Sequence, residues 1–367
     1  MVSELEYNHM DEMGFSEDKQ LMCGATGFLS SANSMKRMCD RFIRNGGRLF
    51  DILTAYDSIL SYGLNRDDRR SGDAIRTLVP LLKAAGVTDS SLYDHFSKNM
   101  DLMPGADVIN YMNGLMTVSL VSETYEHHAL ALCDSLKIPS DMVQSTEVSF
   151  DELELDRNEA KKFREYAADI SKMDIPKVSS GDGIQFIDHK DQMILDTVDG
   201  IIEKMNETDF NYRMEEVKLM GGNEKAFALM DMRRRTMVDL DCTAYIGSNA
   251  TDYPAMDIIY DNEGLALSFN GDAYAVKGAN VAVMSPDPIV AAVLISEFYT
   301  EGLEGVYSMI DSWDRKRLSD REHSDRHLMS AMLRKFPSKL PDVVIVDEDN
   351  LDRVTRESER FRRKLTF

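Results

Sequence analysis

Residues 20–29 decide the fold, and they read Gln20-Leu21-Met22-Cys23-Gly24-Ala25-Thr26-Gly27-Phe28-Leu29. A short apolar run passes into a turn with two glycines, which is the pattern of a buried strand and its exit loop. Six further short segments, rich in apolar and β-branched residues, are expected to be strands: 116–122, 142–150, 242–247, 264–269, 281–284 and 343–346.

Helical spacing of apolar residues fills most of the intervals between these strands. The expected helices include 34–43, 73–85, 90–99, 106–113, 125–136 and 221–234. Strands separated by helices of this length predict parallel pairing with right-handed crossovers, and so an α/β fold with a doubly wound, mostly parallel sheet. Such sheets bind ligands at the carboxyl ends of their strands, so we expect a site in the loops after Met22, Val121 and Ile246.

Composition shifts along the chain predict a core with inserted segments. A flexible acidic arm is expected at 1–18, the core at 19–65, 115–150 and 221–310, a helical insertion at 66–114, a helical cap at 151–220, and a C-terminal extension with one strand and an amphipathic helix at 311–367. The cap segment is charged and has helical patterns, and a loop is expected within it at 179–183.

Charge and hydropathy narrow the classes of function. The 367 residues carry a formal net charge of −22, which repels a nucleic-acid backbone and makes nucleic acid an unexpected partner. No apolar run reaches the roughly 20 residues that span a bilayer, and the acidic N-terminus lacks the basic start of a signal peptide, so we expect a cytoplasmic protein without membrane insertion. The four cysteines are scattered without zinc-ligand spacing and are expected to be reduced thiols.

Four pieces of the chain carry a resemblance to a known family: Asn45-Gly46-Gly47-Arg48, residues 122–127 (Ser-Glu-Thr-Tyr-Glu-His), residues 247–252 (Gly-Ser-Asn-Ala-Thr-Asp), and residues 269–277. The order along the chain of a strand and loop at 21–30, Ser122 at a strand end, Lys225 at a helix start and residues 247–252 after a strand resembles the four motifs of the haloacid dehalogenase (HAD) superfamily. More narrowly, residues 20–310 resemble an archaeal branch whose members in methanogens are described as subunit R of an energy-converting hydrogenase. The resemblance implies a HAD-like Rossmannoid core.

The resemblance also implies a catalytic apparatus that is incomplete here. In the superfamily the first loop holds one Asp that attacks phosphorus and a second acid that protonates the leaving group. The matching positions are Gly24 and Thr26, and neither carries an acid. In the fourth motif, whose acids hold magnesium, Ser248 replaces the first acid and Asp252 remains. No catalytic residue is intact, so we expect no cofactor, with magnesium relevant only if activity is retained.

The motif positions that survive are compatible with phosphate. Ser122 matches the hydroxyl that bonds a phosphoryl oxygen, and Lys225 matches the ammonium that balances its charge. The expected residual anion pocket comprises Ser122, Glu123, Lys225, Asn249 and Asp252. The plainer interpretation also stands, in which Lys225 begins a solvated helix and Ser122 ends a strand.

Other candidate residues have simpler explanations. Asp51 follows an apolar pair as a nucleophile would, but it is expected to face solvent or cap a helix. His127 and His128 are expected to be structural or exposed. The basic runs 233–235 and 360–364 are typical of solvated faces, with contacts inside the protein or to an acidic partner as the alternative.

Three functions from different classes follow. The first is an inactive HAD-like protein that acts as a binding or scaffold subunit for a protein partner or a phosphorylated small molecule. The second is a magnesium-dependent phosphatase that uses non-standard acids, such as those at 151–154. The third is an accessory subunit of an archaeal energy-metabolism complex, which rests on the resemblance alone.

Overall fold

The structure, a computed structural model, describes residues 18–64, 66, 69–181, 184–214, 217–320 and 325–365. The chain forms two compact units. The first contains the described residues up to Leu29, then Leu102–Val121, and the chain from Lys225 onward; the second contains Ser30–Asp101 and Ser122–Glu224. The units divide the chain differently from the segments expected from composition, because residues 30–65 lie in the second unit and 102–114 in the first. The expected acidic arm, Asp18 apart, lies outside the described residues.

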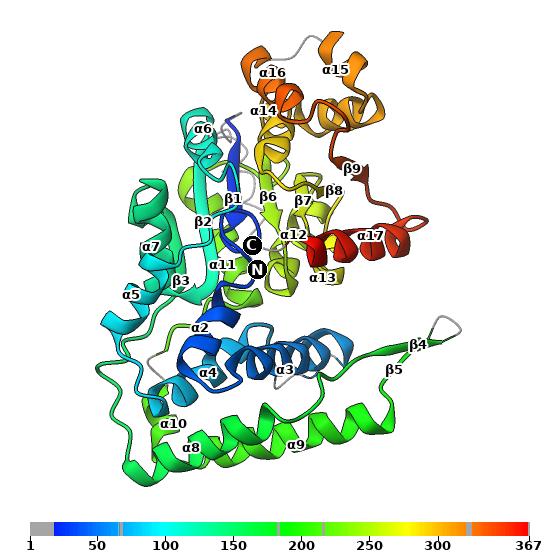
Figure 1. The fold of residues 1–367 in the computed structure, drawn as a ribbon. Helices are drawn as coiled ribbons and strands as arrows, with labels where there is room; N and C mark the ends of the chain where they lie inside the picture. Colours follow the sequence, from blue (N-terminus) through cyan, green and yellow to red (C-terminus); the bar gives the residue numbers. More distant parts are fainter. Residues whose placement is uncertain are drawn as a thin grey trace, which may run out of the picture. The chain divides into compact units, whose positions relative to one another are not determined.

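A seven-stranded sheet has the order β3-β2-β1-β6-β7-β8-β9 (Figure 1). The strands are β1 (Gln20–Gly24), β2 (Thr117–Tyr125), β3 (Val143–Thr146), β6 (Thr243–Gly247), β7 (Leu265–Phe269), β8 (Val281–Met284) and β9 (Asp342–Ile345). The pairs from β2 through β1, β6 and β7 to β8 are parallel, and β9 is antiparallel to β8. The predicted fold class, an α/β fold with a mostly parallel sheet and helical insertions, is confirmed.

The order of the first six strands places a topological switch point beside β1. From β1 the chain continues outward to β2 and β3 on one side, and from β6 to β7 and β8 on the other. This is the arrangement of doubly wound folds, in which the crevice at the carboxyl ends of the two central strands holds the ligand. All five residues of β1 and of β6 are buried, as expected for central parallel strands.

The first unit packs its helices on this sheet. They are α6 (Val108–Leu115), α11 (Gly222–Thr236, which enters the unit at Lys225), α12 (Tyr253–Asp261), α13 (Ala273–Lys277), α14 (Ile289–Asp311), α15 (Arg315–Asp320), α16 (Arg326–Lys335) and α17 (Leu351–Lys364). Met22 and Tyr245 on the strands pack with Leu229 of α11 and Met256 of α12 in one buried cluster. The apolar stripes of these helices therefore hold β1 and β6 in place.

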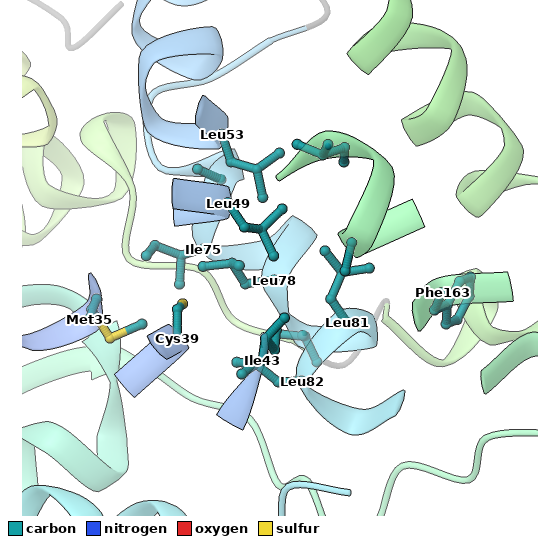
Figure 2. Close-up of a cluster of buried hydrophobic side chains, with 14 of the residues drawn as sticks. Met35, Cys39, Ile43, Leu49, Leu53, Ile75, Leu78, Leu81, Leu82 and Phe163 are labelled. Carbon is teal, nitrogen blue, oxygen red and sulfur yellow. The ribbon is translucent and has the colours of Figure 1, made fainter. Parts of the chain in front are cut away.

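The second unit is largely helical. Its helices are α2 (Ser34–Phe42), α3 (Gly46–Ser58), a π-helical turn (Ile59–Gly63), α4 (Asp73–Ala84), α5 (Asp89–Lys98), α7 (Glu126–Leu136), α8 (Arg157–Ile170), α9 (His189–Asn206) and α10 (Asp209–Arg213). Figure 2 shows its core, where Leu49 and Leu53 of α3 meet Ile75 and Leu78 of α4. Where a loop is expected at 179–183, the structure has a short antiparallel pair, β4 (Ser179–Gly181) and β5 (Ile184–Phe186).

The glycine pair after α2 lets two helices meet closely. Asn45 adopts a left-handed conformation (φ 57°), and α3 begins directly at Gly46. A Cβ on Gly46 would collide with the carbonyl of Cys39, and one on Gly47 with the carboxylate of Asp40. Only glycine lacks that atom, so both positions require glycine for α2 and α3 to meet this closely.

Among the described residues, the structure finds no helix that is both long enough and apolar enough to span a membrane.

Candidate functional site

The candidate site lies at the switch point, where β1 and β6 end side by side in the first unit. Gly24 is the last residue of β1, and Ser248 directly follows Gly247 at the end of β6. The two strands are in parallel register, with Cys23 opposite Ile246. The loops predicted to carry the first and fourth motifs are therefore neighbours.

The carboxylate of Asp252 is at the centre of this site. Its Oδ1 accepts hydrogen bonds from the Lys225 Nζ (2.8 Å) and the Tyr245 hydroxyl (3.0 Å). Its Oδ2 accepts from the backbone N–H groups of Ser248 (2.9 Å) and Asn249 (3.1 Å). Asp252 has no exposed surface. Four donors on one buried carboxylate satisfy it fully inside the protein.

This carboxylate also occupies the space beside Gly24. A Cβ at Gly24 would lie 2.8 Å from Asp252 Oδ1 and 3.1 Å from its Oδ2, closer than non-bonded carbon and oxygen atoms normally approach. The direction in which a nucleophilic side chain would leave β1 is therefore filled by the surviving acid of the fourth motif. With the Asp252 carboxylate in this place, position 24 accommodates glycine, which has no Cβ.

Lys225 is wholly buried and does not begin a solvated helix. Its side chain has no exposed surface, and besides Asp252 its ammonium donates to the Thr251 hydroxyl (2.7 Å). A buried charge requires a partner, since removing an ammonium group from water costs several kcal/mol. In this structure its partner is a carboxylate of the same unit.

Thr26 and Ser248, which the sequence predicts to stand in place of acids, join the neighbouring loops. The Ser248 hydroxyl donates to the carbonyl of Thr26 (2.7 Å). Gly27 has φ 82°, and a Cβ there would collide with the Ser248 side chain. The serine therefore fixes the β1 loop to the β6 loop. Asn249 begins the short helix η4 (Ala250–Asp252), accepting the Thr251 N–H at 2.9 Å.

Ser122 and Glu123 belong to the second unit, and they form hydrogen bonds with residues of that same unit. The Ser122 hydroxyl lies 2.7 Å from Thr124 Oγ1, which lies 3.0 Å from His128 Nδ1. The backbone carbonyl of Glu123 accepts from the Thr146 hydroxyl (2.8 Å). Burial lowers the pKa of His128 to about 4, so this histidine is neutral at physiological pH.

Asp51, His127 and the first basic run form local interactions. Asp51 on α3 pairs with Lys36 (2.6 Å) in a partly exposed position. His127 Nε2 lies 3.0 Å from Asp89 Oδ1 at the start of α5. Arg235 of the basic run on α11 pairs with Asp231 on the same helix (2.9 Å).

Three residues of the strand-end site escaped the sequence reasoning. Tyr245 lies inside a strand that reads as purely structural. Asp272 caps α13, accepting N–H groups of Tyr274 (3.1 Å) and Ala275 (3.0 Å), and burial raises its pKa. Arg362 of α17 donates to the backbone carbonyl of Ser248. The Asn-Gly-Asp sequence at 270–272 is a readable helix-start signal, but nothing local in the sequence connects residue 362 to the loop after β6.

The residues present do not fit a magnesium ion. Mg²⁺ takes carboxylate oxygens that are free to face it, and both oxygens of Asp252 face an ammonium, a hydroxyl or an N–H group. Among the described residues no group of three or more His, Cys, Asp or Glu side chains is arranged to hold a metal.

Comparison with known proteins adds a likeness of fold. No protein-family model and no curated protein matches the chain. The structure matches that of a gene product from Archaeoglobus fulgidus with a TM-score of 0.75 and 19% identity, over 95% of this chain and 96% of that one. It also matches a phosphoserine phosphatase in the form of a phospho-aspartyl intermediate analogue, with a TM-score of 0.38 and 10% identity over 76% and 99% of the two chains.

A HAD family hydrolase from Salmonella enterica serovar Typhi matches with a TM-score of 0.39 and 11% identity, over 74% of this chain and 73% of that one. The Archaeoglobus likeness extends over nearly the whole of both chains and, at 19% identity, it shows the fold alone.

Proposed function

We propose that this chain is a HAD-like protein that binds a partner and does not transfer phosphoryl groups. Support for the HAD-like part comes from the switch point beside β1 and from the positions of the motif residues. Gly24, Ser248, Asp252 and Lys225, far apart in the sequence, meet at the carboxyl ends of two central strands. A HAD-type site would occupy that place in a doubly wound sheet.

The observation that carries the proposal is that the Asp252 carboxylate is buried and that both of its oxygens accept hydrogen bonds from the protein itself. Phosphoryl transfer through an aspartyl intermediate needs a free carboxylate as nucleophile and a second acid to protonate the leaving group. At the end of β1 the chain supplies Gly24 and Thr26, and the carboxylate beside them is bound by four donors with no access to solvent. A substrate phosphate would have to displace this carboxylate to reach Lys225.

Hydrolysis of para-nitrophenyl phosphate with magnesium tests the proposal. We expect the wild-type rate to equal that of the Asp252→Asn variant, because neither protein offers a nucleophile. Both are assayed at a temperature where circular dichroism shows them folded. A magnesium-dependent rate in the wild type that is lost in Asp252→Asn would establish a phosphatase with non-standard acids.

Phosphate binding without turnover at the residual pocket is a separate part of the proposal. The ion pair between Lys225 and Asp252 satisfies the ammonium, so an anion at this place must compete with an internal carboxylate. We expect inorganic phosphate, at constant ionic strength, to change the melting temperature of the wild type and of the Lys225→Met variant by the same amount, because binding at Lys225 contributes nothing. A saturable rise that is absent in the Lys225→Met variant would show that the pocket opens to anions.

A protein partner is the occupant that the surface favours. Phe227 on α11 is 72% exposed, and Met230, one turn further along the same helix, is 40% exposed. Large apolar side chains presented together to solvent are a common feature of protein–protein contacts, although single ones are ordinary. Phe227→Ser should abolish co-purification of a specific partner from the native cell. The matched variant Met193→Ser, at a 57% exposed position on α9, should retain it.

A further inference from the structure

A cavity of about 500 Å³ lies in the second unit, lined by α2, α5, the loop that follows α5, and His128 of α7. Its buried lining includes Ser34, Phe96 and His128. Its more exposed lining includes Arg37, Arg41, His95 and Lys98. The cavity shares no residue with the strand-end site that contains Lys225.

The orientation of α2 explains why the basic side chains face this cavity. Met35 and Cys39 of this helix are buried in the unit's hydrophobic core, as Figure 2 shows. Arg37 and Arg41, four residues apart, share another face, and both line the cavity. The cavity is therefore cationic although the chain as a whole carries a net charge of −22.

One of these cations is available to a ligand. Arg37 is paired with Asp101, and Lys98 with Asp94 (2.8 Å). Arg41 is exposed, and within the described chain it has no carboxylate partner; its guanidinium lies 6.0 Å from the centroid of the Phe42 ring. An arginine in this position offers a planar set of N–H donors suited to phosphate or carboxylate oxygens.

The second feature is a buried ring nitrogen of the lining residue His128, Nε2, which has no hydrogen-bond partner in the part of the chain that the structure describes. The other ring nitrogen, Nδ1, contacts Thr124 Oγ1 at 3.0 Å, and that hydroxyl contacts Ser122 Oγ at 2.7 Å. The Ser122 oxygen also accepts the Thr124 backbone N–H at 3.3 Å. The direction of this chain of hydrogen bonds fixes the state of the histidine.

Only one direction gives both hydroxyl protons an acceptor and leaves a single atom, Nε2 of His128, without a partner among the described residues. If Ser122 donates to Thr124 and Thr124 donates to His128 Nδ1, both hydroxyl protons are used, and the ring carries its proton on Nε2. In the opposite direction Ser122 has a buried O–H without an acceptor, and His128 has a bare Nε2 as well. Each such orphan costs about 1–3 kcal/mol, so the first arrangement is favoured. His128, a residue of the cavity lining, then carries an N–H donor, and the charged lining residues are Arg37, Arg41 and Lys98 against the single carboxylate of Asp101.

We propose that this cavity binds a small oxyanion, the phosphate or carboxylate group of a metabolite, through the Arg41 guanidinium and the Nε2–H of His128. The chemistry of both groups selects a negatively charged acceptor: Arg41 supplies charge and His128 supplies a directed donor that has no other partner. Phe96, whose ring packs edge-on against His128 at 5.0 Å, gives the lining an apolar wall. The Ser122 hydroxyl, which by the family resemblance would hold a phosphoryl group directly, here orients His128.

Calorimetric titration with two probes tests this site. Inorganic phosphate and citrate are titrated separately into the full chain at pH 7, at constant ionic strength set by sodium chloride. We expect saturable binding of at least one probe, and the tighter of the two shows which oxyanion the cavity prefers. Arg41→Gln should weaken that binding about tenfold or more, the effect of losing one charge-assisted contact. Arg44→Gln, which removes the same charge from an exposed residue outside the cavity lining, should leave it within about twofold.

The imidazole ¹⁵N spectrum of the wild-type protein gives a second readout. We expect His128 to be neutral with its proton on Nε2 and the Nε2 resonance to move when the probe binds. Absence of saturable binding for both probes, equal weakening by the two arginine substitutions, or a proton found on Nδ1 would each overturn the proposal. None of these results depends on whether the chain hydrolyses phosphate esters, so the two proposals fail separately.

Discussion

At the scale of single residues, one missing side chain changes the role of its neighbours. With hydrogen in place of a side chain at Gly24, the carboxylate of Asp252 lies against the end of β1 and pairs with Lys225. Lys225 and Asp252, to which the family resemblance would give roles at a phosphoryl group and its metal, here pair with each other. The ion pair is buried on both sides, so its effect on stability is large when only one partner is removed.

Asp252→Asn tests the ion pair. The variant leaves a buried ammonium without a compensating charge, and we expect a loss of about 3–5 kcal/mol in the free energy of unfolding. Urea denaturation followed by circular dichroism measures it. Asp231→Asn breaks the exposed pair with Arg235 and should cost less than about 1 kcal/mol. Similar losses in the two variants would mean that the Lys225 ammonium is not buried as described.

Gly24→Ala tests the close approach at the end of β1. The added methyl group would lie 2.8 Å from Asp252 Oδ1, so we expect a loss of about 1–3 kcal/mol from overpacking. Gly200 provides a control, because it lies within α9 and a Cβ there would meet nothing within 4 Å. Gly200→Ala should gain about 0.5–1 kcal/mol from helix propensity. A neutral or stabilising Gly24→Ala would show that the space beside β1 is open.

The buried acid Asp57 on α3 predicts a pH dependence of stability. Burial raises its pKa to about 8, although its carboxylate accepts the Gly72 N–H at 2.7 Å. The unfolded chain loses this proton near pH 3.8, the ordinary pKa of an aspartic acid, while the folded chain keeps it, so folding is favoured at low pH. This contribution falls by up to about 1.4 kcal/mol per pH unit as pH rises from about 4 to about 8.

Asp57→Asn should remove this slope, because an amide does not titrate. The urea midpoints of the variant and the wild type at pH 5 and pH 8 measure it. Asp51→Asn, a partly exposed position on the same helix, should keep the wild-type slope. A wild-type slope that survives in Asp57→Asn would assign the titration to another group.

At the scale of elements, the C-terminal helix α17 is tied to the loops at the strand ends. Ser358 Oγ donates to the carbonyl of Gly271 (2.7 Å), and Arg362 donates to the carbonyl of Ser248. These contacts lie within the first unit and place a helix from the end of the chain on the loops after β6 and β7. Like the ion pair between Asp252 and Lys225, they hold the loops at the strand ends against other residues of the first unit.

Arg362→Ala should loosen this helix. We expect faster amide hydrogen exchange over Leu351–Lys364, because the variant loses hydrogen bonds that join α17 to the loops. Arg363→Ala removes the same charge from a 71% exposed side chain, whose partner Glu359 lies on the same helix at 3.8 Å, and should exchange like the wild type. If both substitutions speed amide exchange equally, the effect comes from the lost positive charge on α17 and not from the hydrogen bonds of Arg362.

The elements also show what local sequence can and cannot predict. The apolar runs of β1 and β6 identify them because a central parallel strand is buried on both faces. The end of β2 was harder to place: the strand continues to Tyr125, three residues past the predicted end at Ser122. Pairing with neighbouring strands sets such ends, and pairing is not encoded in a local pattern. The short pair β4 and β5 escaped prediction for the same reason.

At the scale of the whole molecule, the chemistry of the site could be read more easily than its geometry. The absence of acids at Gly24, Thr26 and Ser248 is visible in the sequence, because it depends on residue type alone. That Asp252 would lie against Gly24 depends on the short helix after β6 and on the register of two strands. The cavity beside His128 brings together residues from distant parts of the chain, and no local pattern could have indicated it.

The most direct test of the central claim asks whether the chain can accept a phosphoryl group. The purified protein is incubated with acetyl phosphate and magnesium, and its intact mass is measured alongside that of the Asp252→Asn variant. Because the Asp252 carboxylate is buried and hydrogen-bonded and Gly24 has no side chain, we expect both proteins to keep their unmodified mass. An acid-stable, hydroxylamine-sensitive phosphoryl adduct on the wild-type chain, absent from the variant, would contradict the account.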